Sequence, residues 1–126
     1  WARRAGGCDL DCIEQALSNR AAAILGIPQI AHLHPSAYAD WCVYTNGSTA
    51  RTKRAALALV VRGGVPQIGD LDVMAKFTHV QTIPALLDGV PKRIHVALAR
   101  QIARCSLREP GLELDTDFIR QHMKHT

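Results

Sequence analysis

Cysteine is the residue type in this chain whose number and spacing carry the clearest chemical signal. The four cysteines are Cys8, Cys12, Cys42 and Cys105. An even number is typical of the disulfide framework of a small secreted protein, and bridges from the first two cysteines to the two distant ones would pin the first helix. Each bridge would stabilise the fold by about 3–4 kcal/mol in the chain-entropy model. Four free thiols, packed as small apolar side chains, explain the same sequence equally well.

Histidines downstream of the first two cysteines complete the ligand types of a tetrahedral zinc site. Cys8 and Cys12 with His32 and His34 would make a Cys₂His₂ set. However, the spacing C-x₃-C-x₁₉-H-x-H is not that of a zinc finger. The two histidines would also point the same way only in an extended segment. We therefore expect solvated loop histidines and predict no metal site and no cofactor.

Motifs of enzyme active sites are missing from the sequence. It has no phosphate-binding loop, no dinucleotide-binding fingerprint, no H-E-x-x-H and no G-x-S-x-G. Asp70 and Asp72 have the chemistry of a cation site or a general acid, but they lie where a helix would begin, and carboxylates there usually serve the helix dipole. Cys42 would act as a nucleophile only beside a histidine, so we expect a structural role for it. The sequence leans towards a protein without catalytic activity.

The segment VYTNGSTA, residues 43–50, resembles the first-strand motif of ribonuclease H-like domains, in which a strand is followed by T-D-G-S. The family's aspartate helps to hold catalytic magnesium, and Asn46 stands in its place here. Asparagine lacks the charge that a divalent-metal site needs. The family's later carboxylates have no counterparts at matching positions. The resemblance therefore implies a lapsed ribonuclease H-like domain.

Arginines give the chain a basic character, with a net charge of +4 and a pI near 9.1. Such a balance attracts nucleic acid, phosphate or acidic surfaces. Arg93, Arg100 and Arg104 would share one face of a helix that begins at Pro91, because their spacings are seven and four. Guanidinium groups suit phosphate and carboxylate contacts. We expect a protein partner at this basic helix face, with nucleic acid or phosphate as the alternative and a solvated face as the simplest interpretation.

Two amphipathic helices are predicted at the ends of the chain. Residues 11–25 carry apolar side chains at helical spacing, a capping-box pattern at Asp11 and Glu14, and a stop at Gly26. A second apolar stripe runs from Pro91 to Cys105, with the proline suited to the first turn. A helix broken near Pro84 over residues 70–88 and a short final helix from Asp115 or Thr116 complete the prediction.

The middle of the chain leaves two interpretations open. WCVYT, residues 41–45, favours a short strand, and the following NGS favours a turn. Residues 50–62 then form either a helix that ends at Gly63 and Gly64 or a buried strand after a hairpin. Periodicity cannot separate these for so short a run.

Composition places the chain among ordinary globular domains, since 48% of residues are hydrophobic and 21% are charged. We predict a single domain over residues 1–126, with residues 1–8 as a flexible arm. The predicted fold is mainly α with four to five helices; the second choice is α+β with a small sheet around residues 41–73. No apolar run approaches the roughly 20 residues of a membrane helix.

The predicted function is a non-catalytic basic helical interaction module, in the role of a subunit in a larger assembly. The alternatives are a secreted, disulfide-stapled effector or toxin-like protein and the lapsed ribonuclease H-like domain. The chain begins with Trp1 instead of methionine, and Asn46 begins an N-x-S glycosylation acceptor triplet. Both features favour a secreted or organellar protein with a processed N-terminus.

Overall fold

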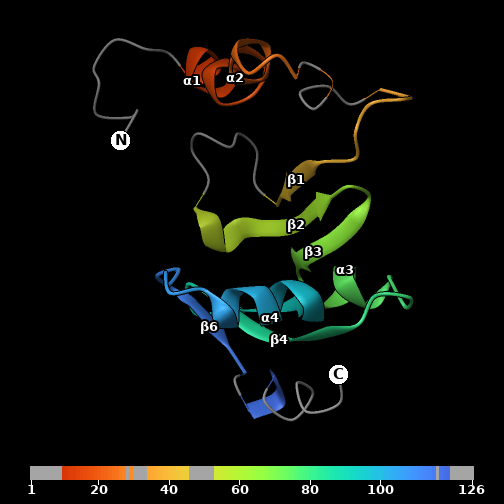
Figure 1. Cartoon of the computed structure of the whole chain (residues 1–126), viewed down its shortest axis with the longest axis vertical. Helices are drawn as coiled ribbons and strands as arrows, with labels where there is room; N and C mark the ends of the chain where they lie inside the picture. Colours follow the sequence, from red (N-terminus) through yellow and green to blue (C-terminus); the bar gives the residue numbers. More distant parts are fainter. Residues whose placement is uncertain (1–9, 28, 30–33, 46–52, 116, 120–126) are drawn as a thin grey trace.

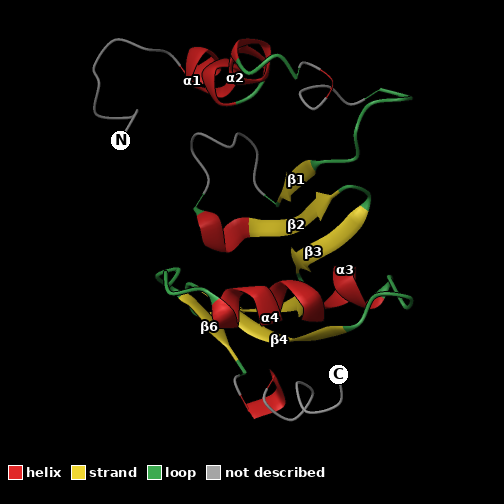
Figure 2. Ribbon diagram, viewed as in Figure 1, coloured by secondary structure: helices red, strands yellow, loops and turns green. Residues whose placement is uncertain are grey.

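A six-stranded antiparallel sheet dominates the computed structural model, which describes residues 10–27, 29, 34–45, 53–115 and 117–119. The strand order is β1-β2-β3-β5-β4-β6 (Figures 1 and 2). The strands are β1 (Trp41–Tyr44), β2 (Leu57–Arg62), β3 (Val65–Gly69), β4 (Thr82–Leu87), β5 (Val90–His95) and β6 (Leu112–Leu114). The prediction of a mainly helical fold is therefore wrong. The second choice named the correct class but too small a sheet, since strands extend to residue 114.

Four short α-helices accompany the sheet in the described part of the chain. They are α1 (Leu10–Leu17), α2 (Asn19–Ile24), α3 (Leu71–Ala75) and α4 (Val96–Arg104), and a 3-10 turn, η3 (Arg54–Ala56), precedes β2. The predicted first helix is two helices with a break at Ser18, whose hydroxyl donates to the Glu14 carbonyl (2.7 Å). Figure 1 shows this helix pair beyond β1, at the end of the molecule away from α4. None of these helices is long and apolar enough to span a bilayer.

Two tight hairpins explain why the sequence forms strands where helices were predicted. Gly63 and Gly64 join β2 to β3 with φ of 55° and 77°, and Asp88 and Gly89 join β4 to β5 with φ of 50° and 78°. Positive φ at both central residues is the signature of a type I′ turn, whose twist matches that of paired strands. Residues 57–62 are therefore a strand, which settles the alternative left open between helix and strand.

Pro84 and Pro91 lie inside β4 and β5, not at a helix break or a first helical turn. The two-residue hairpin makes Leu87 and Val90 a hydrogen-bonded pair. Hydrogen-bonded and non-hydrogen-bonded pairs alternate along antiparallel strands, so the pairs that contain Pro91 and Pro84 are both non-hydrogen-bonded. On their other sides, Pro91 lies beyond the residues paired with β3, and Pro84 lies beyond Leu114, the last paired residue of β6. The missing N–H groups therefore remove no bond of the ladder.

The core divides between the two faces of the sheet. On one face Ile83 and Ile94 pack with Val96 and Ala99 of α4. On the opposite face Leu59 and Val61 pack with Met74 of α3. The register shows that the two faces are opposite, because Leu59 pairs with Gly69 and Gly69 pairs with Arg93, so these three residues share one face. Ile94 follows Arg93 in the strand and therefore projects to the other face. Helix α3 covers only β2, β3 and part of β5, so the described helices leave β4 and β6 open on its side.

The two halves of the sheet meet at a short seam. Strands β3 and β5 pair at only two positions, Ile68 with Ile94 and Gly69 with Arg93. Gly69, at the end of this seam, permits close packing of β2 on its other side, because a Cβ at this position would lie 2.7 Å from the Ala58 carbonyl oxygen. Beyond the seam the chain leaves the sheet to form α3.

Candidate ligand-binding site

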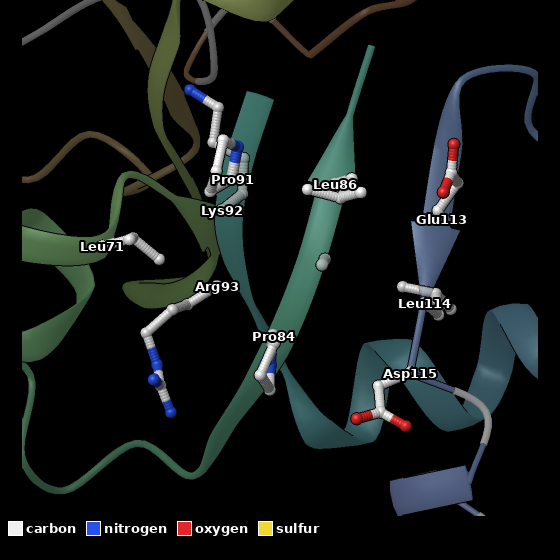
Figure 3. Close-up of a pocket in the computed structure, with 10 residues that line it drawn as sticks. Leu71, Pro84, Leu86, Pro91, Lys92, Arg93, Glu113, Leu114 and Asp115 are labelled. Carbon is white, nitrogen blue, oxygen red and sulfur yellow. The ribbon is translucent and has the colours of Figure 1, made fainter. Parts of the chain in front are cut away.

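A groove lies on the α3 side of β4, β5 and β6, where no described helix covers the sheet. It encloses about 490 Å³, and we refer to it as the sheet groove. Figure 3 shows its lining side chains, which come from three strands and the start of α3. They are Leu71, Pro84, Ala85, Leu86, Pro91, Lys92, Arg93, Glu113, Leu114 and Asp115.

The floor of the sheet groove is apolar because of the strand register. Pro84 pairs with Arg93, and Leu86 pairs with both Pro91 on β5 and Glu113 on β6. Paired residues in a sheet project to the same face. Pro84 and Leu86 on β4 thus lie between a basic residue on β5 and acidic residues on or just after β6.

Arg93 forms the basic wall. Its Nε donates to the Thr82 hydroxyl (2.6 Å) and its Nη2 donates to the Thr82 carbonyl (3.1 Å). A guanidinium carries five N–H groups, so three remain after these two bonds. Within the described ranges no carboxylate lies at ion-pair distance from Arg93. A half-buried cation is therefore held in place with unused donors beside an apolar floor.

The acidic wall lies across β4, on the edge strand β6 and just after it. Glu113 is exposed, and its carboxylate makes no hydrogen bond or ion pair with the described residues. Asp115 accepts a hydrogen bond from the Phe118 N–H at Oδ1 (3.0 Å), which caps the helical residues 117–119. Because β4 separates β5 from β6, the two walls rise from strands two spacings apart, about 10 Å. The site therefore has one charge sign on each side.

Lys92 is among the lining residues of the groove, but its charge is engaged elsewhere. Its Nζ donates to the Leu57 carbonyl (2.6 Å) and to Asp70 Oδ1 (2.5 Å), and the side chain is 2% exposed. These two bonds link β5 to the first residue of β2 and to the residue before α3, just beyond the last pair of the β3–β5 seam. Arg93 is thus the cation of the groove that remains available to a ligand.

A second ionic cluster, the Arg54 clasp, lies where the β4–β5 hairpin meets the turn before β6. Arg54 pairs with Asp88 (Nη2 to Oδ1, 2.5 Å; Nε to Oδ2, 3.0 Å) and with Glu109, and donates to the Pro110 carbonyl. The hydrogen bond from Arg54, with its positive charge, lowers the pKa of Asp88, and the same contact raises the pKa of Arg54. The clasp holds the loop that follows β4 and the turn that precedes β6 close together.

The predicted disulfides are not formed among the described cysteines. Cys42 and Cys105 are free thiols, Cys12 forms no disulfide with either of them, and Cys8 lies outside the described residues. Cys42 lies on the edge strand β1, three strand spacings or about 14 Å from β5, whereas Cys105 follows α4, which packs on β5. A disulfide needs Cα atoms within about 7 Å. The predicted bridges from Cys8 and Cys12 are not formed either, because both of their intended partners, Cys42 and Cys105, are free, so the prediction of a disulfide-stapled effector is wrong.

The predicted basic helix face is divided between the two sides of the sheet. The helix begins at Val96 instead of Pro91, so Arg93 belongs to β5 and faces the sheet groove. Arg100 and Arg104 lie on α4, which packs on the opposite side. Binding of a protein, nucleic acid or phosphate by these two arginines stays a prediction, but a helical interaction module is wrong as a description of this sheet protein.

The remaining candidates from the sequence do not converge on a site. Asn46 and His32 lie outside the described residues. Over the described ranges, no three or more His, Cys, Asp or Glu residues are arranged to hold a metal ion. Residues 43 and 44 do lie in a strand, as the ribonuclease H-like motif implies, but among the residues that the structure describes no metal-holding carboxylate cluster accompanies it. That resemblance therefore gains no site in the structure.

Comparison with other proteins leaves the groove as the main guide to function. No protein-family model, no curated protein and no solved structure matches this chain.

The sequence prediction missed Thr82, which holds Arg93, and Glu113 and Asp115, which form the opposite wall of the groove. The available signal was the D-G dipeptide at residues 88–89, flanked by apolar residues, which is typical of a hairpin. A hairpin at that point would have placed Pro84 opposite Arg93.

Proposed function

We propose that this protein binds, without chemical conversion, a small ligand that has an apolar body and a carboxylate. The apolar body lies on Pro84, Leu86 and Pro91, and the carboxylate contacts Arg93. The observation that carries the proposal is the guanidinium of Arg93, which Thr82 holds beside an apolar floor with three N–H groups to spare.

The size and chemistry of the sheet groove support binding of a small molecule. Its volume of about 490 Å³ falls within the roughly 300–1,000 Å³ of typical ligand sites. A carboxylate fits the planar donors of arginine in a bidentate contact. The lining contains no histidine, cysteine or hydroxyl side chain, so it offers no nucleophile with an adjacent base. These features favour binding over catalysis.

A nuclear magnetic resonance titration with 3-phenylpropanoate tests the proposal. We expect saturable shifts at the Arg93 amide and at the methyl groups of Leu86. The matched alcohol, 3-phenylpropan-1-ol, should bind at least about tenfold more weakly, because a hydrogen bond to a charged group is worth about 1.5–3 kcal/mol.

Arg93→Gln provides the matching protein variant, and Arg104→Gln on the other side of the sheet provides its control. We expect the first variant to lose the preference for the carboxylate and the second to keep it. Equal binding of acid and alcohol to the unaltered protein, or an unchanged preference in Arg93→Gln, would refute the proposed function.

A further inference from the structure

We infer that the ligand is a peptide of about three residues with free termini, which lies across the strands with its carboxylate on Arg93 and its ammonium group on Asp115. This inference rests on the proposed function and names the substrate class of the same groove. The observation behind it is the opposite charge of the two walls. A simple carboxylic acid would contact only the basic wall and would leave the acidic wall without a partner group.

Charge and position select Asp115 as the acceptor of the ammonium group. Figure 3 shows the Asp115 carboxylate and the Arg93 side chain at the same end of the groove, on either side of Pro84. The Glu113 carboxylate points towards the other end. Asp115 uses Oδ1 to accept the Phe118 N–H, which leaves Oδ2 for a ligand. A zwitterion that spans Pro84 therefore meets a cation at one end and an anion at the other.

The spacing of the walls sets the length of the ligand. Strands β5 and β6 lie two strand spacings apart, about 10 Å. An extended chain advances about 3.3–3.6 Å per residue, so three residues cover this distance. A free amino acid carries its two charges within one residue and reaches only one wall.

The floor favours a ligand that is held at its ends. Pro84 and Pro91 have no N–H group, so they cannot donate a hydrogen bond to a peptide backbone. Their rings and Leu86 offer apolar contact instead. An apolar central side chain would bury surface there, while the terminal charges fix the direction of the peptide.

Isothermal titration with the tripeptide Ala-Leu-Ala in three forms tests the inference. The forms are the free peptide, the N-acetylated peptide and the C-terminal amide. We expect the free peptide to bind, and each blocked form to bind about tenfold more weakly. Free leucine should bind more weakly than the tripeptide by a similar factor.

The two proposals can fail separately in this experiment. If the amide loses affinity but the acetylated peptide does not, or if leucine binds as well as the tripeptide, the peptide inference is overturned and carboxylate binding on Arg93 stands. If the tripeptide does not bind and 3-phenylpropanoate does, the inference is likewise overturned. If neither ligand binds, the proposed function itself fails.

Asp115→Asn tests the contact at the acidic wall. The amide oxygen can still accept the Phe118 N–H, so the helical cap is retained while the charge is removed. We expect this variant to bind the free and acetylated tripeptides equally. Asp72→Asn, on α3 and outside the groove lining, is the control and should keep the preference for the free form. An unchanged preference in Asp115→Asn, with circular dichroism equal to that of the unaltered protein, would overturn the assignment.

Discussion

Lys92 and Asp70 form an ion pair beside the β3–β5 seam, where the lysine is 2% exposed and the Asp70 side chain is 27% exposed. A lysine so deeply buried needs a partner, because an unpaired charge in the interior is strongly unfavourable. Asp70 therefore contributes to stability mainly by compensating the positive charge of Lys92, which the fold buries beside the seam.

Asp70→Asn should lower the free energy of unfolding by about 3 kcal/mol, the lower end of the cost of breaking a buried pair because Asp70 is partly exposed, since it leaves the buried ammonium group without its counter-charge. Asp72→Asn, two residues away on the exposed side of α3, should change it by less than about 0.5 kcal/mol. Urea unfolding measures both. Adding Lys92→Met to Asp70→Asn should cost less than the sum of the two single changes, and strict additivity would contradict a coupled pair.

The Arg54 clasp should make stability depend on pH. Arg54 holds the pKa of Asp88 below its ordinary value of 3.8, so the stabilisation is fully present above that value and is lost as the pH falls through the lower pKa of the folded state. Asp88→Asn removes the charge and keeps a residue that tolerates positive φ. The unaltered protein should be more stable than this variant at pH 7, and the difference should vanish in acid. A difference that persists under acid conditions would refute this origin.

Gly111 should tolerate alanine less well than Gly89. Both have positive φ (77° and 78°), so both substitutions carry backbone strain of about 1–2 kcal/mol. A Cβ at residue 89 meets no atom within 4 Å, whereas one at residue 111 overlaps the Asp88 carboxylate and Arg54. Differential scanning calorimetry should show the lower melting temperature for Gly111→Ala, and the excess loss should shrink when Asp88→Asn already weakens the clasp.

Cys42 should alkylate slowly at neutral pH even though it reaches the surface. Partial burial raises the pKa of its thiol above the ordinary 9.0, and the thiolate is the reactive form. Peptide mass spectrometry after iodoacetamide treatment should give a rate for Cys42 that rises with pH along a curve displaced to higher pH than that of the unfolded chain. Coincident curves would show that the folded environment does not affect this thiol.

Thr82→Val should weaken carboxylate binding and leave the fold intact. The substitution removes the hydroxyl that accepts from Arg93 Nε (2.6 Å) and keeps a β-branched side chain suited to a strand. Affinity for 3-phenylpropanoate should fall several-fold with an unchanged melting temperature. Thr45→Val on the far side of the sheet is the matched control, and equal effects of the two would argue against a positioning role for Thr82.

Several local features of the fold could be predicted from the sequence. The strand at residues 41–44, the helical stop at Gly26 and the helical stripe after residue 96 follow from composition, positive φ and periodicity. The N-terminal helical region was also predicted, although Ser18 divides it because its hydroxyl bonds to the Glu14 carbonyl.

The errors came from giving prolines and spacing more weight than turn chemistry. Pro91 fits a first helical turn and equally an unpaired position of a strand, and only the Asp88–Gly89 hairpin separates these. The misplaced helix start then assigned Arg93 to the wrong side of the molecule. The groove itself depends on which strands become neighbours, and β6 reaches β4 across a helix and a loop that local patterns do not connect.

The brevity of the β3–β5 seam has a mechanical consequence. Strands β1, β2 and β3 form one three-stranded leaf and β4, β5 and β6 form another; two backbone pairs join them, together with the side-chain contacts of Lys92 and Arg54. Amide protons should therefore exchange with solvent as two cooperative groups with different opening energies, divided after Gly69. Only the second leaf carries the floor and both charged walls, so separation of the leaves would leave ligand recognition almost whole.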